Sequence, residues 1–257
     1  MSRSRAPLPG LTLLTILLVP LLSCERGNWP AAPEGHNYRT VHIVRKIEGN
    51  VRGTSEEFIE TSGYSNGRLH YKRFAIKNRV ERDVGWGGRP PLRTDAWIIN
   101  DRNVMYYISE PNRLTYKRHH NLDQYMKVAR IYFWQELAVG IIQRHDLTPA
   151  QRNEIKVKFN ALKEEDLKKV GAKITPDTFL GHKVKRYEIP TNGGRAILLM
   201  YGDIPLKEEL TYKRGAGTFV KRMVATKFEL NKCLPREAFT PPKGYKIIDR
   251  TRPIPMQ

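Results

Sequence analysis

Apolar and polar residues alternate along much of the chain with a period of two, which is typical of β-strands with one buried face. In the first half of the chain the pattern begins after Tyr38, and its apolar positions are Val41, Ile43, Leu69, Tyr71, Phe74 and Ile76. Gly63, Asn66-Gly67 and the Gly- and Pro-rich segment 85–91 consist of turn-forming residues. The pattern therefore predicts β-strands joined by turns from residue 38 onward.

The segment 97–118 predicts a three-stranded antiparallel meander. Its strands are expected at 97–99, 104–108 and 114–116, with turns at 100–103 and 110–113. Pro111-Asn112 is a common turn pair, and loops this short join strands that are antiparallel neighbours. The meander is the clearest local unit of the sequence.

Between residues 121 and 170 the apolar positions recur every three or four residues, as in amphipathic helices. They are Leu122, Tyr125, Met126, Ala129, Phe133 and Leu137 in a first helix, and Ile155, Phe159 and Leu162 in a second. Thr148 is placed to cap the second helix, with Pro149 at its first position and Gln151 at its third. Gly171 is a typical residue to end it. We expect two helices inserted between two β halves.

Strands return after the helical insert and are expected at 183–189, 195–201, 207–212 and 219–230. Neither β half shows a closure of its own, so the pattern predicts one continuous sheet. The predicted fold class is α+β, mainly antiparallel β. We expect a single domain over residues 38–250, with its helical insert at 121–170.

The first residues of the chain have the features of an export signal. Arg3 and Arg5 precede the apolar stretch Leu11–Leu22, which at 12 residues is too short to span a bilayer. The stretch ends in Leu21-Leu22-Ser23-Cys24, which is similar to the lipobox of bacterial lipoproteins. In such proteins the cysteine becomes the new N-terminus and its thiol carries the lipid.

These features predict a signal peptide at 1–23, lipid attachment at Cys24 and a flexible tether at 24–37. Residue 25 is Glu rather than Asp, so the inner-membrane retention signal of enteric bacteria is missing. We therefore expect a palmitate-type anchor in the outer membrane, facing the periplasm. The alternative is ordinary signal cleavage, with Cys24 joined to Cys233 in a disulfide.

The chain is strongly basic. The interpretation of this charge depends on whether the protein is exported, as its first residues predict. Lys and Arg number 45 against 26 Asp and Glu, which gives a formal net charge of +19. Exported proteins do not normally meet nucleic acid, so we expect no nucleic-acid partner. The Lys and Arg residues are scattered over all segments of the chain. One interpretation is that they lie on solvated faces, and the other is that they attract the protein to the anionic surface of the membrane.

No motif of a known catalytic or cofactor site is present. The chain lacks Gly-x-Ser-x-Gly, a phosphate-binding loop, His-Glu-x-x-His and a dinucleotide fingerprint. We therefore expect neither an enzyme nor a cofactor or metal, and the sequence leaves the oligomeric state open. His119-His120 with Asp123, Glu56-Glu57 and Glu164-Glu165-Asp166 are interpreted as solvated polar residues, and Cys233 as a small buried residue when it is unpaired.

Four segments together resemble the lipoprotein-localisation superfamily of periplasmic carriers, outer-membrane receptors and related lipoprotein-sorting domains. They are Trp97-Ile98-Ile99-Asn100-Asp101 to Tyr106-Tyr107-Ile108 with Glu110-Pro111, then 181–188, 203–207 and 239–245. The likeness covers about 40–118 and 172–249, and the long basic segment 121–170 departs from it. The resemblance implies an unclosed β-barrel, whose open side is covered by helices and encloses an apolar cavity for acyl chains.

On this interpretation the protein is a non-enzymatic outer-membrane lipoprotein that binds lipid or lipoprotein acyl chains, with a role in lipoprotein sorting. The expected cavity residues are Trp97, Ile99, Tyr106, Ile108, Phe133, Leu198 and Met200. Strand alternation leaves an ambiguity of one residue, so that Ile98 and Tyr107 are alternatives to their neighbours. The rival interpretation is an interaction lipoprotein with a filled core, whose basic surface binds anionic envelope components.

Overall fold

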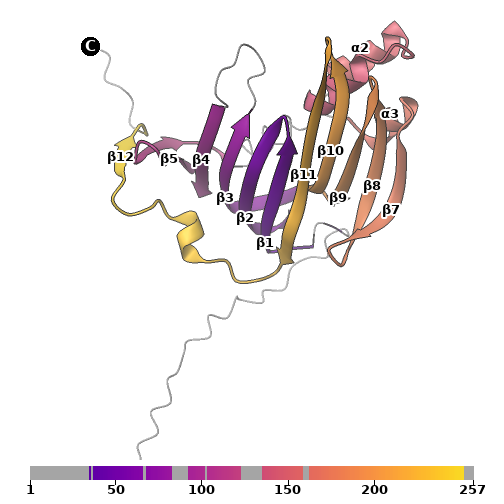
Figure 1. Cartoon of the computed structure of the whole chain (residues 1–257). Helices are drawn as coiled ribbons and strands as arrows, with labels where there is room; N and C mark the ends of the chain where they lie inside the picture. The colour runs from indigo at the N-terminus through magenta and orange to yellow at the C-terminus, as the bar shows by residue number, and fades with distance from the viewer. Residues whose placement is uncertain are drawn as a thin grey trace, which may run out of the picture.

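We describe the protein from a computed structural model, which covers residue 35 and residues 37–65, 68–82, 92–101, 103–122, 135–158 and 162–251. Its main element is one 12-stranded sheet in the order β12-β6-β5-β4-β3-β2-β1-β11-β10-β9-β8-β7. Figure 1 shows that the strands curve around one side as an open half-barrel. The predicted fold class, a single mainly antiparallel sheet that does not close into a barrel, is confirmed.

The strands follow one another along the sheet with few crossovers. The first half comprises β1 (Thr40–Gly49), β2 (Val51–Ser65), β3 (Arg68–Arg82), β4 (Leu92–Asp101), β5 (Val104–Ser109) and β6 (Leu114–His119). The second half comprises β7 (Lys173–Phe179), β8 (His182–Thr191), β9 (Gly194–Tyr201), β10 (Ile204–Arg214) and β11 (Gly217–Leu230). The short β12 (Lys246–Asp249) pairs with β6 and is parallel to it, whereas all other pairs are antiparallel. The predicted meander corresponds to β4, β5 and β6.

The central strand β2 was not predicted. β2 contains Glu56 and Glu57, which we expected to be solvated loop or helix charges, and instead both side chains lie in a central strand. Glu57 forms an ion pair with Arg45, and Glu56 contacts His42 at 2.9 Å. The prediction failed because β2 lacks a clear alternation of apolar and polar residues. Its charged side chains form ion pairs with the neighbouring strand instead.

Helices interrupt the sheet between β6 and β7. Residues 135–142 are helical, and α2 (Pro149–Lys158) and α3 (Glu164–Lys169) follow. The predicted cap is present, since the Thr148 hydroxyl accepts a hydrogen bond from the Gln151 amide at 3.2 Å and Gln151 Oε1 accepts one from the Thr148 amide at 2.9 Å. The expected second helix is divided into two, because Asp166 accepts a hydrogen bond from the Lys163 amide and starts α3. Within the described residues, no helix is long and apolar enough to cross a membrane.

The register assigns every strand residue to one of two faces. Ile43 lies opposite Glu57 of β2 and Phe228 of β11, and this side is called the inner face. His42 lies opposite Phe58 and Glu229, and this side is called the outer face. The helices pack on the inner face, which therefore contains most of the core.

Two apolar clusters pack against the sheet. Cluster I joins the middle of the sheet to the start of the helical insert, and its buried members include Val41, Ile43, Ile59, Phe74, Leu122, Leu206 and Phe228. Cluster II joins the helices to β8, β9 and β10, and its members include Leu137, Ile141, Ile155, Leu167, Ile189, Leu198, Met200 and Leu210. Leu122 belongs to cluster I and Leu137 to cluster II, so the helical insert contacts both clusters.

A third cluster lies on the outer face, under the segment that follows β11. This segment, residues 231–245, is called the C-terminal strap, and it contains a short 3₁₀-helix, η1 (Arg236–Phe239). Ala238 and Phe239 pack against Ala75, Ile99 and Ile108 of β3, β4 and β5. In Figure 1 the strap runs from the lower end of β11 past the lower ends of the strands to β12 at the sheet edge. The outer face is therefore buried where the strap covers β3, β4 and β5.

Candidate functional site

The expected cavity residues do not form one group in the structure. Ile99 and Ile108, with Trp97 and Tyr106, belong to the cluster under the C-terminal strap on the outer face. Leu198 and Met200 belong to cluster II on the inner face. Phe133, the remaining expected residue, lies outside the described part of the chain. The cavity outlined in the sequence analysis therefore combined residues from opposite faces of the sheet.

In β4 and β5 the predicted inner-face residues differ from the observed ones by one position. Ile98 lies opposite Ile76 of β3 and Tyr107 of β5, which places these three side chains on the inner face. Ile98 is half-buried, and the Tyr107 side chain is 38% exposed. The alternative assignment with Ile98 and Tyr107 is therefore the one that the structure shows. The alternation of apolar and polar residues could not distinguish the two assignments, because β4 has apolar side chains on both faces.

An ionic network crosses the inner face between the two apolar clusters. The guanidinium of Arg45 forms an ion pair with Glu57, and its Nε donates a hydrogen bond to the Pro205 carbonyl at 3.2 Å. Only 4% of the Arg45 side chain and 13% of the Glu57 side chain are exposed. A buried arginine with two acceptors is well compensated, whereas the same cation without them would be costly.

The second part of the network connects the sheet to the helical residues 135–142. Lys221 Nζ lies 3.2 Å from Glu208 Oε1 and donates a hydrogen bond to Glu136 Oε2 at 2.6 Å. Burial raises the pKa of Glu208, although the nearby Lys221 and Arg45 cations lower it. Burial alone would lower the pKa of Lys221, but the two carboxylates together hold it above its ordinary value. Glu208 lies between Leu206 of cluster I and Leu210 of cluster II, so the network separates the two clusters.

An uncharged polar side chain is also buried on the inner face. Asn100 of β4 is 0% exposed, and neither its Oδ1 nor its Nδ2 has a hydrogen-bond partner among the described residues. Its cross-strand neighbours on the same face are Phe74 and Met105, which are buried and apolar. Buried polar side chains in native proteins are almost always hydrogen-bonded. Asn100 is therefore an exception that the packing around it does not explain.

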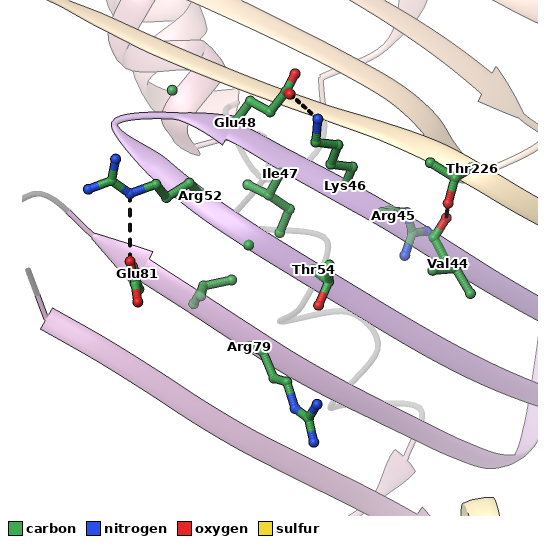
Figure 2. Close-up of a pocket in the computed structure, with 13 residues that line it drawn as sticks. Val44, Arg45, Lys46, Ile47, Glu48, Arg52, Thr54, Arg79, Glu81 and Thr226 are labelled. Atoms are coloured by element: carbon green, nitrogen blue, oxygen red, sulfur yellow. Dashed lines mark hydrogen bonds and ion pairs between the residues drawn. The ribbon is translucent and has the colours of Figure 1, made fainter.

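A groove of about 870 Å³ lies at the ends of β1, β2 and β3. Figure 2 shows side chains from these strands along it, with Lys46 and Glu48 on β1, Arg52 at the start of β2 and Arg79 on β3. Two glycines contribute no side chain to the groove. At one of them, Gly53 (φ +143°), a Cβ atom would lie 1.9 Å from the Arg79 carbonyl oxygen, so only glycine fits there.

The register places Lys46, Thr54 and Arg79 in one row on the outer face of this groove. All three side chains are exposed. Lys46 pairs with Glu48 at 2.5 Å, and Arg79 lies 3.7 Å from Glu110. Exposed pairs of this kind contribute little energy, so both cations can change partners. The row presents a hydroxyl between two cations, an arrangement that suits an anionic oxygen group.

The structure also places most of the other polar candidates. Among the described residues, no three His, Cys, Asp or Glu side chains stand close enough to hold a metal ion. His119 lies at the end of β6, whereas Asp123 is outside the described part of the chain. Asp166 is buried near the start of α3, where Lys158 contacts it at 3.0 Å, and it is therefore not a solvated charge.

Cys233 lies in the C-terminal strap and is disulfide-bonded in the structure. The chain contains two cysteines in all, and Cys24 is outside the described residues. A thiol that carries a lipid is not available for a disulfide. Lipid attachment at Cys24 and a disulfide between Cys24 and Cys233 both stay predictions.

Comparisons with known proteins give a remote likeness of fold. No protein-family model matches the chain, and no curated protein matches it. An uncharacterized conserved protein from Thermus thermophilus is similar at a TM-score of 0.39 and 5% identity, over 84% of this chain and 93% of that one. The MucA/MucB complex of Pseudomonas aeruginosa matches at 0.37 and 11%, over 83% and 59%, and MucB at 0.36 and 12%, over 84% and 61%. The resemblance to the lipoprotein-localisation superfamily stays a prediction from sequence, and the proposals below rest on the residues themselves.

Proposed function

We propose that this protein is a non-enzymatic binding protein of the cell envelope that holds the acyl chain of a lipid or lipoprotein on the inner face of its sheet. The observation that carries the proposal is the inner face itself. The inner-face apolar side chains of β1 to β3 belong to cluster I, cluster II lies under the helices on the same face of β8 to β10, and the helical insert contacts both clusters. In this arrangement the insert is the cover of the binding site.

The energetics of such a site require no catalytic group. Burial of an acyl chain contributes about 0.8 kcal/mol for each methylene, so a chain of ordinary length is held by contact with apolar side chains alone. The ion pair between Glu136 and Lys221 fastens residues 135–142 of the cover to β11. When a ligand enters between the helical insert and the sheet, apolar contacts between the two are replaced by apolar contacts with the acyl chain. Uptake can therefore be reversible.

Uptake of a hydrophobic fluorescent probe, diphenylhexatriene, tests the proposal. Tyr107→Asp places a charge on the inner face and is expected to weaken probe binding by about tenfold, because the carboxylate must be desolvated or displaces the probe. Tyr106→Asp, the matched control, places the same charge one residue away on the outer face, where binding should not change. The measurement is probe fluorescence against protein concentration, with mass spectrometry of lipid that co-purifies. A wild-type protein that binds no probe and carries no lipid would contradict the proposal.

We also propose that the protein resides at the outer membrane, anchored through Cys24 and with its basic outer face directed to anionic lipids. The row of Lys46, Thr54 and Arg79 supports this second contact, since each cation near an anionic surface adds about 1 kcal/mol. The lipid anchor and the basic outer face respond differently to the salt concentration. Ionic screening weakens only the electrostatic contact between the basic face and the membrane. This difference separates the two contributions.

Membrane fractionation at low and high salt is the corresponding measurement. The wild-type protein is expected to remain with membranes at any salt concentration, whereas Cys24→Ser protein should bind at low salt and leave at high salt. Replacing Lys46 and Arg79 with glutamine in the Cys24→Ser protein should weaken the low-salt binding. Release of wild-type protein by salt would contradict the anchor and favour the disulfide between Cys24 and Cys233. Absence of low-salt binding by Cys24→Ser would contradict the role of the basic face.

A further inference from the structure

Asn100 places a polar group inside an otherwise apolar part of the inner face. Its carboxamide offers two donor hydrogens and an acceptor oxygen, and no protein group within the described part of the chain uses them. An unpaired polar group in such a site destabilises the folded state, and a leucine of similar shape would avoid that cost. A polar ligand group that forms these hydrogen bonds would remove the cost.

The surroundings of Asn100 indicate what kind of ligand group this is. Phe74 and Met105, its neighbours in the register, offer no hydrogen bonds, and Phe74 belongs to cluster I. A ligand with its polar end at Asn100 therefore has its apolar part next to cluster I. The buried charged groups of the inner-face network pair with one another, Arg45 with Glu57 and Lys221 with Glu208.

We propose that the Asn100 carboxamide binds the primary amide group of a long-chain fatty amide whose hydrocarbon part lies along cluster I. A primary amide has an N–H on the same side as its carbonyl oxygen, so one ligand group pairs with both orphan atoms of Asn100. An ester offers acceptors alone and leaves the Asn100 oxygen unpaired. An ionised carboxylate also lacks a donor, and its charge would be buried without a cation. This inference rests on the proposed function and adds the chemical class of the ligand.

Displacement of diphenylhexatriene from the full-length Cys24→Ser protein tests the inference. Hexadecanamide and methyl hexadecanoate have equal acyl chains and differ in the presence of a donor. This parent protein is expected to bind the amide about tenfold more tightly, the effect of one or two net hydrogen bonds. Asn100→Leu should lose this preference and still bind the probe. Its denaturation midpoint should equal or exceed that of the parent, because a buried unpaired amide has been removed.

Thr115→Val is the matched control for the Asn100 variant. Thr115 is also fully buried with an Oγ1 that has no partner among the described residues, but it lies opposite Ile108 on the outer face. Its replacement should leave the amide preference intact. Equal affinity of the parent protein for amide and ester would overturn the inference while leaving acyl binding in place, since Asn100 would then hold no more than a water molecule. Probe binding that is absent from the parent protein would overturn the proposed function itself. The comparison of amide and ester in the parent protein needs no variant, so a misfolded variant does not affect the test.

Discussion

Replacing Arg45 with methionine is expected to lower the free energy of unfolding by about 3–5 kcal/mol, because it leaves the carboxylate of Glu57 without its cation in a buried site. The variant also removes a cation whose field lowers the pKa of Glu208. Both effects act on the polar band between the apolar clusters. Chemical denaturation followed by circular dichroism gives the free energy.

Two further variants separate the buried pair from charge in general. Arg222→Met removes a cation that pairs with Glu209 at 2.8 Å but is 51% exposed, and its effect should stay below about 1 kcal/mol. Combining Arg45→Met with Glu57→Leu should recover much of the loss, since no uncompensated carboxylate remains. If the two arginine variants lose equal stability, or if the double variant is no better than Arg45→Met alone, burial of the pair is not the cause.

Phe239→Ala is expected to destabilise the protein by about 3–4 kcal/mol, because it creates a cavity under the C-terminal strap. The ring is buried against Ala75, Ile99 and Ile108, and the guanidinium of Arg73 lies 4.4 Å from its centre. Hydrogen exchange measured by mass spectrometry should show faster exchange in the strap and in β12 than in β9 or β10. The strap and β12 are expected to lose protection because η1 provides few contacts to the sheet other than those of Phe239.

The matched control for Phe239 lies further along the same segment. Ile247 of β12 is 56% exposed, so Ile247→Ala should change stability by less than about 0.5 kcal/mol. If Phe239→Ala has an equally small effect, the strap does not stabilise the outer face. Exchange that increases equally in all strands would also contradict a local role for the strap.

The sequence predicted strands where apolar residues alternate with polar ones, as in β1 and β10, and where a run of apolar residues lies next to turn residues, as in β4 and β9. It also predicted the capping pair of Thr148 and Gln151. It failed for β2, where charged side chains such as Glu57 enter the sheet because partners on neighbouring strands neutralise them. It also missed the edge strand β7, whose Pro176 and polar residues are tolerated because one side of the strand has no partner strand in the described sheet.

The candidate site was less predictable than the fold, and the reason lies in β4 and β5. Trp97, Ile98 and Ile99 are all apolar, so their sequence does not show which of them faces the helices. The answer depends on the C-terminal strap, which covers the outer face and gives Ile99 a buried site of its own. A contact between segments so distant in the sequence cannot be deduced from local periodicity. Asn100 was likewise assigned to a turn, because its burial follows from the length of β4 and the packing above it.

The pairing of β1 with β11 has a consequence for how fast the protein folds. The Arg39 amide donates to Asn231 Oδ1 across 192 positions of the chain, and this junction joins the two halves of the sheet. A topology with such high contact order has a large entropic barrier to loop closure and folds slowly. The strand edges at β1 stay open until nearly the whole chain has been synthesised. During that interval this edge is open to pairing with other chains.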